Sequence, residues 1–295
     1  MTKRLKYFVG GEWLDSATDE WYPITNSSTG EVMAEAPRCT PEEVNAAVAA
    51  AAAAFPAWRD TPLPQRVQVM FRFKERLEAN LHDLAVLTAT EMGKNYIEAR
   101  GDILKVIEVV ELACALPVTM QGDSLMNVSR GFDTVTYREP LGVFVGIAPW
   151  NFPGMIPMGW MTPLAVTTGN TFVLKAASPV PQTAMRLAEL LHDSGLPAGV
   201  FNLVTCSRHE AEQLLTHPDV RGISFVGSKK VGWHVYRTAA AGGKRVQALT
   251  EAKNHALVLR DAPIYATAQR IINSAFGCAG QRCMALPVIA VEEAI

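Results

Sequence analysis

Two cysteines lie five residues apart near the end of the chain, and the surroundings of the second favour reactivity. Cys278 and Cys283 belong to the segment FGCAGQRCMALP. The five cysteines of the chain are odd in number and show no CxxC spacing, which indicates neither a disulfide framework nor a zinc site. Cys283 follows Gly-Gln in a flexible loop after the helical run ATAQRIINSAFG, and the adjacent Arg282 would favour the thiolate. We expect Cys283 to be a candidate nucleophile and Cys278, at the helix end, to be a packed small residue.

Two further side chains stand where predicted strands end. In GIAPWNFPG the strand stops before Asn151, whose amide could donate a hydrogen bond to a developing oxyanion. An asparagine that satisfies turn backbone is the more frequent alternative. In FVLKAAS the strand ends at Lys175, which could reach a ribose or phosphate, although a solvent-exposed lysine is the more common case.

Composition describes a globular protein with a large core. The chain has 295 residues, of which 49% are hydrophobic and 19% charged, with a formal net charge of −2. This balance gives no electrostatic reason to expect nucleic acid or a membrane as a partner. The five cysteines are odd in number, and no apolar run has the length of a signal peptide or membrane span. We therefore expect free thiols and a cytoplasmic protein, or in a eukaryote an organelle matrix protein whose transit peptide is absent.

The first third is mostly helical after a short β opening. YFVGGEWL is typical of a hairpin that turns at two glycines. A helix should begin with Thr40 as its N-cap and Pro41 at its first position. We expect Pro56 to end that helix.

Periodic apolar residues then predict further helices and an exposed strand. Helices are expected within residues 63–93 and 96–116, with Cys114 on an apolar face and in the core. FDTVTYR, at 132–138, alternates as an exposed strand does.

From residue 141 short apolar runs alternate with helical stretches, which predicts a parallel sheet with helical crossovers. This is an α/β architecture of nucleotide-binding type, although neither GxGxxG nor GxxxxGK[ST] is present. In SFVGSKKVG the helix after Ser228 could hold a pyrophosphate, but an ordinary strand-to-helix turn is the commoner explanation. The runs that predict strands are LGVFVGIAPW, TFVLKAA, VFNLVT, VRGISFVG and RVQAL.

The order of these motifs resembles the aldehyde dehydrogenase superfamily over the whole chain. PWNFP, the strand-end Lys175, FVGS with Gly232 four residues after its serine, and GQRC occur in that family's order. AKNHALVL and GQRCMAL, supported by QGDSL and YREPLGV, resemble the CoA-acylating methylmalonate-semialdehyde dehydrogenases most closely. The resemblance implies a Rossmann-type NAD-binding domain and the beginning of an α/β catalytic domain. The NAD-binding domain is expected over residues 1–249, with a helical N-terminal region over 1–120, bridging strands at about 121–140 and the sheet at 141–249; the catalytic domain, over 250–295, is incomplete.

The resemblance also implies roles. Cys283 would attack the aldehyde carbon, while Asn151 and the Cys283 backbone N–H would stabilise the oxyanion. Hydride would then pass to the nicotinamide and leave a thioester on the cysteine. The implied cofactor contacts are Ala148, Trp150, Lys175, Ser178, Ser228 and the backbone carbonyl of Thr250.

The acceptor of the thioester distinguishes members of the family. Hydrolysing members carry a glutamate in an ELGGK segment, and the matching LTEAK holds Leu249 at that position. Coenzyme A, whose thiolate needs little activation, is then the expected acceptor. Methylmalonate semialdehyde would give propionyl-CoA and CO₂, and malonate semialdehyde would give acetyl-CoA. Arg282 would hold the substrate carboxylate. Valine and inositol breakdown are the pathways that the resemblance suggests.

Three departures leave alternatives open. Glu251 replaces a glycine and could act as a base, which would restore hydrolysis. KAAS replaces KPSE at 175–178 and removes an acid that would repel a 2′-phosphate, so NAD is expected with NADP as an alternative. Family members continue well beyond residue 295, so the chain could be an inactive nucleotide-binding fragment, whereas an intact chain should form a dimer or tetramer.

Overall fold

The computed structural model describes residues 2–295 and is built around a seven-stranded sheet of order β12-β11-β8-β9-β10-β2-β3. Strand β8 is the first of the parallel strands in sequence and lies near the middle of the sheet. The chain winds from β8 outward through β9 to β10, and then returns to the other side of β8 for β11 and β12. This confirms the predicted α/β fold with a parallel sheet. The five parallel strands are β8 (Val143–Ile147), β9 (Thr171–Lys175), β10 (Phe201–Val204), β11 (Val220–Gly227) and β12 (Arg245–Thr250).

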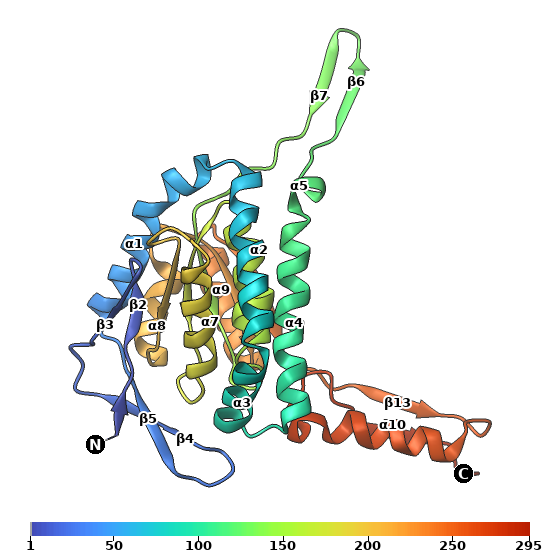
Figure 1. Cartoon of the computed structure of the whole chain (residues 1–295). Helices are drawn as coiled ribbons and strands as arrows, with labels where there is room; N and C mark the ends of the chain where they lie inside the picture. Colours follow the sequence, from blue (N-terminus) through green and yellow to red (C-terminus); the bar gives the residue numbers. More distant parts are fainter. Residues whose placement is uncertain (1) are drawn as a thin grey trace.

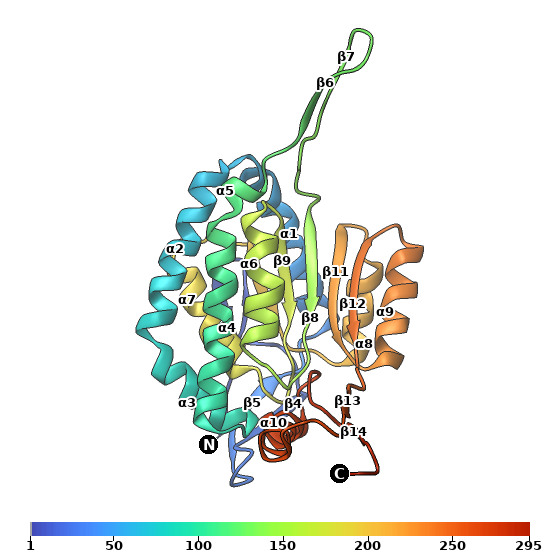
Figure 2. The same cartoon turned by 90° about the vertical axis from the view of Figure 1, so that its right-hand side faces the viewer.

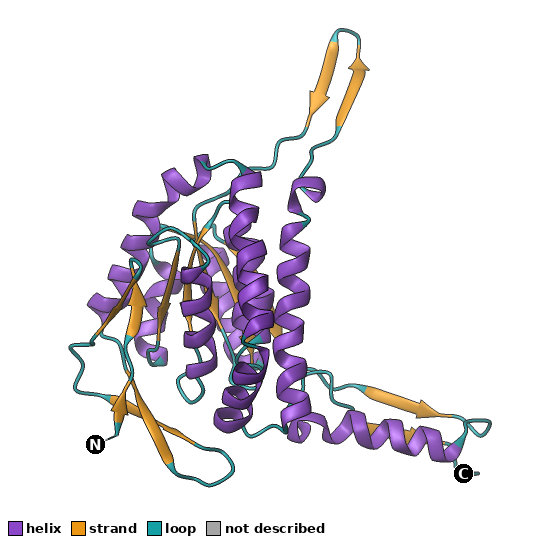
Figure 3. Ribbon diagram, viewed as in Figure 1, coloured by secondary structure: helices purple, strands orange, loops and turns teal. Residues whose placement is uncertain are grey.

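Helices cover both faces of this sheet, as Figure 3 shows. In β9, Phe172 and Leu174 join one hydrophobic cluster, whereas Val173 between them joins the other. Successive residues of a strand point to opposite faces, so the two clusters lie on opposite sides of the sheet. One side holds α1 (Pro41–Asp60), α8 (Arg208–Thr216) and α9 (Lys229–Ala241), and the other holds α2 (Leu63–Ala79), α4 (Tyr96–Cys114), α6 (Thr162–Thr167) and α7 (Gln182–Asp193).

The predicted N-terminal hairpin is confirmed. Its strands β2 (Tyr7–Val9) and β3 (Glu12–Leu14) pair antiparallel, and β2 joins the edge of the sheet beside β10. Gly10 and Gly11 have φ angles of 65° and 88°, the left-handed values that a two-residue hairpin turn requires. A second, three-stranded sheet was not predicted from the sequence; it contains β1 (Lys3–Arg4), β4 (Trp21–Thr25) and β5 (Val32–Pro37).

The prediction that Pro56 ends the first helix is wrong. Helix α1 begins as expected at Thr40, whose side chain forms a capping box with Glu43, but it continues through Pro56 to Asp60. Trp58 in the last turn is buried, and its Nε1 donates a hydrogen bond of 2.7 Å to the carbonyl of Val166. This tertiary contact holds the turn that the proline would otherwise end.

The segment 63–93 forms two helices, α2 and α3 (Leu81–Met92), which meet at Asn80. Cys114, at the end of α4, is only partly buried against the core. After α5 (Leu116–Thr119), strands β6 (Ser124–Ser129) and β7 (Phe132–Val135) form an exposed hairpin that projects far from the body (Figures 1 and 2). The predicted strand therefore exists but stops three residues before Arg138.

The end of the chain forms a separate arm. Strands β13 (His255–Val258) and β14 (Val288–Val291) pair in parallel, with α10 (Ile264–Phe276) beside them. The arm extends from the N-terminal end of α4 (Figure 1). The domain division at residues 249 and 250 stays a prediction. No helix within residues 2–295 is long and apolar enough to cross a membrane.

Candidate active site

The predicted site residues gather at one edge of the sheet. The strands from β8 to β12 that carry them are parallel, so their carboxyl ends meet at the same edge. Strands β9 and β10 lie on one side of β8, and β11 and β12 lie on the other, so the strand order reverses beside β8. The crevice at such a reversal is the expected place for a ligand. Ala148, Trp150 and Asn151 follow β8, Lys175 ends β9 with Ser178 just beyond it, Ser228 follows β11, and Thr250 ends β12.

A cavity of about 620 Å³ opens at this edge, between α8 and α9. Ile147 and Lys175 line it from the strand ends, with Arg208 on α8 and Lys230 on α9. Burial lowers the pKa of Lys175. The cavity's size suits a nucleotide, and its cations suit the negative charge of one. Of the predicted cofactor residues, only Lys175 lines this cavity.

Helix α9 lies very close to strand β12 because Gly232 has no side chain. A Cβ atom at Gly232 would stand 2.3 Å from Cγ2 of Thr250. The close approach brings the beginning of α9, where Ser228 is the N-cap, next to the end of the strand. The Ser228 side chain makes no capping hydrogen bond, so N–H groups in the first turn of this 13-residue helix lack that partner. An anionic group could accept hydrogen bonds from them.

The structure brings Asn151 and the cysteine loop together across 130 residues of sequence. Nδ2 of Asn151 donates a hydrogen bond of 2.7 Å to the carbonyl of Gln281, two residues before Cys283. Cys278 is 1% exposed, with Sγ 3.8 Å from the carbonyl oxygen of Asn151, which confirms that it is a packed residue. Cys283 is partly buried, and among the described residues Oδ1 of Asn151 is buried without a hydrogen-bond partner.

Two residues that hold the cysteine loop were missed from the sequence. Nδ2 of Asn254 donates to the carbonyl oxygens of Cys283, at 2.9 Å, and Ala285, at 2.7 Å. Glu98 on α4 accepts a hydrogen bond of 2.7 Å from the backbone N–H of Cys278. Asn254 lies in the AKNHALVL segment, which was used above only as evidence of the family resemblance and not as part of the site. No pattern in the sequence indicated a role for Glu98.

The structure shows the surroundings of Arg282, Leu249 and Glu251, which the sequence did not indicate. Nη2 of Arg282 lies 3.1 Å from Oε1 of Glu98, so this arginine is already paired within the protein. Leu249 is 44% exposed at the end of β12 and presents an apolar surface there. Glu251 is exposed just beyond the strand.

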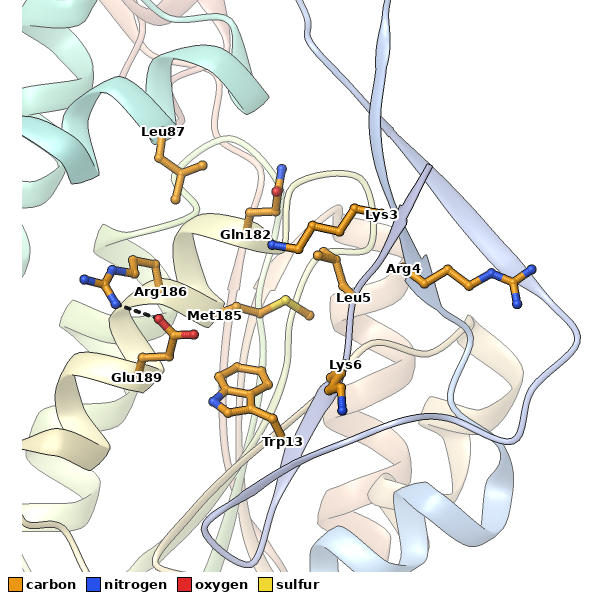
Figure 4. A pocket seen from close by; sticks show the side chains of 10 residues that line it. All are labelled: Lys3, Arg4, Leu5, Lys6, Trp13, Leu87, Gln182, Met185, Arg186 and Glu189. Atoms are coloured by element: carbon orange, nitrogen blue, oxygen red, sulfur yellow. Dashed lines mark hydrogen bonds and ion pairs between the residues drawn. The ribbon is translucent and has the colours of Figure 1, made fainter. Parts of the chain in front are cut away.

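A second cavity, of about 430 Å³, lies between the N-terminal segment and α7 (Figure 4). Three of its cations are paired within the protein: Arg186 with Glu189, Lys6 with Asp15, and Arg4 with Glu35. None of the predicted site residues lines it. Of these two cavities, the one between α8 and α9 is therefore the one that a predicted site residue, Lys175, lines.

The sequence was compared with models of known protein families. The model of the aldehyde dehydrogenase family matches residues 13–295, and the chain belongs to that family.

Individual relatives narrow the comparison. Malonate-semialdehyde dehydrogenase 1 of Geobacillus thermodenitrificans is 48% identical over 285 residues, which cover 97% of this chain and 59% of the relative. The crystal structure of methylmalonate-semialdehyde dehydrogenase (DddC) from Oceanimonas doudoroffii is 40% identical, with a TM-score of 0.95 over 99% of this chain and 59% of its own. A Sinorhizobium meliloti 1021 structure, assigned as a methylmalonate-semialdehyde dehydrogenase and complexed with NAD, is 37% identical with the same TM-score and coverage. The chain thus spans about 59% of the length of these relatives.

Proposed function

We propose that this chain carries the cofactor-binding and nucleophile-bearing region of an NAD-dependent, CoA-acylating semialdehyde dehydrogenase. The observation that carries the proposal is the hydrogen bond between Asn151 and Gln281, which joins the turn after β8 to the loop of Cys283. Both lie at the carboxyl edge of the sheet, where the large cavity also opens. Family membership and the names of the relatives support the reaction class.

In the proposed reaction Cys283 is the nucleophile. Its sulfur bonds to the aldehyde carbon, and the electron pair of the carbonyl moves to oxygen. The amide of Asn151 has two N–H donors, of which one is bound to Gln281, so the second can donate to that oxyanion together with the Cys283 backbone N–H. The two hydrogen bonds from Asn254 keep the backbone of Cys283 and Ala285 in place.

When bound, a nicotinamide cofactor would supply the acceptor for the hydride of the former aldehyde carbon. Lys175 would bind the ribose from the wall of the cavity, and the beginning of α9 at Ser228 would bind the pyrophosphate. Ala148, Trp150, Ser178 and Thr250 complete the proposed contacts. NAD is the proposed cofactor, as in the S. meliloti complex, and NADP is its competitor because the cations of the cavity would also accept a 2′-phosphate.

Coenzyme A is the proposed acceptor of the thioester. Leu249 offers no carboxylate to activate water, whereas a thiolate near neutral pH attacks without a strong base. Malonate and methylmalonate semialdehyde are the proposed substrates, with acetyl-CoA and propionyl-CoA as products after loss of CO₂. Arg282 is proposed to orient the substrate carboxylate, for which it must share its charge with Glu98.

A homo-oligomer, dimer or tetramer, is also proposed for the intact enzyme. The projecting hairpin supports it, because Leu125, Met126 and Phe132 are 59%, 73% and 67% exposed. An apolar hairpin of this kind gains stability when another subunit covers it.

Product analysis with and without coenzyme A tests the function. The full-length protein should form NADH and acyl-CoA from either semialdehyde only when CoA is present. Cys283→Ser should abolish NADH formation, whereas the matched Cys278→Ser should retain it. Free acid at full rate without CoA would instead support hydrolysis, and its loss in Glu251→Gln would identify the base. Tight NAD binding with no NADH burst from the 295-residue chain would identify that chain as a binding fragment.

A further inference from the structure

We propose that helix α4 positions both halves of the active site, with Glu98 orienting the cysteine loop and Asp102 orienting the turn that carries Asn151. The inference rests on the proposed function of Cys283 and Asn151. Neither carboxylate would touch the substrate in this role. They are positioning residues that act through the two loops.

Glu98 holds the cysteine loop at two points. Its Oε1 accepts a hydrogen bond of 2.7 Å from the backbone N–H of Cys278 and lies 3.1 Å from Nη2 of Arg282. Its Oε2 accepts a bond of 2.8 Å from Nδ2 of Asn95, the residue that also caps α4. Both oxygens are therefore occupied, and the carboxylate has little freedom to turn away from the loop. The two residues it holds flank Gln281, the partner of Asn151.

Asp102 holds the other half. Its Oδ1 accepts a hydrogen bond of 2.6 Å from the backbone N–H of Met155, four residues after Asn151. Its Oδ2 pairs with Nζ of Lys94 at 2.9 Å, and both side chains are fully buried. The same Nζ lies 3.9 Å from the ring centroid of Phe152, the residue after Asn151. The turn is thus tied to α4 through its backbone and through an aromatic ring.

The two carboxylates stand one helical turn apart on the same helix. Residues four apart in an α-helix lie on one face, so Glu98 and Asp102 present their acceptors along a single line. The helix has 19 residues, and the side chain of Asn95 caps its N-terminus, which stabilises the turn that carries Glu98. The contact between Asn151 and Gln281 then depends on α4, which binds both loops, and not on either loop alone.

The experiment uses Glu98→Ala in the full-length enzyme, with Glu98→Gln as the conservative variant. Loss of the carboxylate should lower kcat by about 100-fold, the effect expected when a reacting group moves by about 1 Å. The KM and Kd for NAD should stay near the wild-type values, because the cavity lies on other elements. Hydrogen exchange at Cys278 should become faster. Glu98→Gln should restore much of kcat, since its amide oxygen can still accept from the Cys278 N–H.

Glu111→Ala is the matched control, because Glu111 lies on the same helix in an exposed pair with Lys74. It should leave kcat and hydrogen exchange unchanged. Wild-type kcat and wild-type exchange in Glu98→Ala would overturn the inference, as would an equal fall in kcat and NAD affinity with no rescue by glutamine. If Glu98→Ala does not fold, Glu98→Asp takes its place, because the shorter side chain withdraws the acceptor from the Cys278 N–H. Faster exchange at Cys278 with a lowered kcat supports the inference, and wild-type values of both refute it. A wild-type enzyme that makes no NADH would refute the proposed function instead, and exchange would still test the positioning.

Discussion

Replacement of Lys94 by methionine should destabilise the protein strongly, because Lys94 is one member of a fully buried ion pair. Nζ of Lys94 lies 2.9 Å from Oδ2 of Asp102, and neither side chain is exposed to solvent. Lys94→Met leaves the carboxylate buried without its counter-charge. Breaking a buried pair in this way costs about 3–5 kcal/mol in the free energy of unfolding.

The cost should depend on pH. Burial raises the pKa of Asp102 even with Lys94 present, and the Lys94 charge opposes that rise. Without Lys94 the folded-state pKa of Asp102 must rise further above its unfolded value. Such a group binds more protons in the folded state, so its stabilising contribution is present at low pH and is lost as pH rises through the folded pKa. Lys94→Met should therefore lose more stability, relative to the wild type, at pH 8 than at pH 5.

A double variant separates the charge from the packing. Lys94→Met/Asp102→Leu removes both charges, and its main remaining loss is the acceptor for the Met155 N–H, about 1–3 kcal/mol. The double variant should then be more stable than Lys94→Met at pH 8. Urea unfolding followed by tryptophan fluorescence measures this, provided that the m-value is constant across variants.

The exposed pair of Lys74 with Glu78 supplies the control. Lys74→Met should cost less than about 1 kcal/mol, as exposed pairs do. The reasoning would be refuted by a cost for Lys94→Met as small as for Lys74→Met, or by an equal cost at both pH values.

Three further changes test other regions of the structure. Burial raises the pKa of Glu91 to about 7, despite hydrogen bonds from the N–H groups that begin α7, so wild-type stability should fall as pH rises from about 4.5 to 7. Glu91→Gln should remove that fall, up to about 3 kcal/mol at 1.36 kcal/mol per pH unit, in urea unfolding at each pH; an unchanged slope would contradict it. Gly232→Ala should weaken NAD binding, measured by calorimetry, because its Cβ would collide with Thr250. Gly101→Ala on α4 is the control and should leave NAD binding unchanged, because its Cβ would have no neighbouring atom within 4 Å. Trp58→Phe should lower stability by about 1 kcal/mol through loss of the bond to Val166, and an unchanged thermal midpoint would refute the explanation given for the length of α1.

The features that the sequence predicted correctly depend on neighbours within a few residues. The Thr40 cap, the two-glycine turn of the hairpin and the apolar strand runs are local patterns with local causes. Parallel pairing of the strands follows from their alternation with helices, and it places Lys175 and Asn151 at one edge of the sheet. Cys283 was proposed as the nucleophile from the residues of its own loop, and that role stays a prediction.

The sequence alone did not determine the supports of the site, because each is a contact between distant segments. Glu98 meets Cys278 across 180 residues, and Asn254 meets Cys283 from 29 residues away. The helix through Pro56 is likewise explained by a tryptophan that reaches Val166, 108 residues away. Such contacts leave no periodicity, cap or turn signature, since their partners are brought together only when the helices pack on the sheet. Residue types thus indicated which groups could do chemistry here, and tertiary packing decided which groups hold them in place.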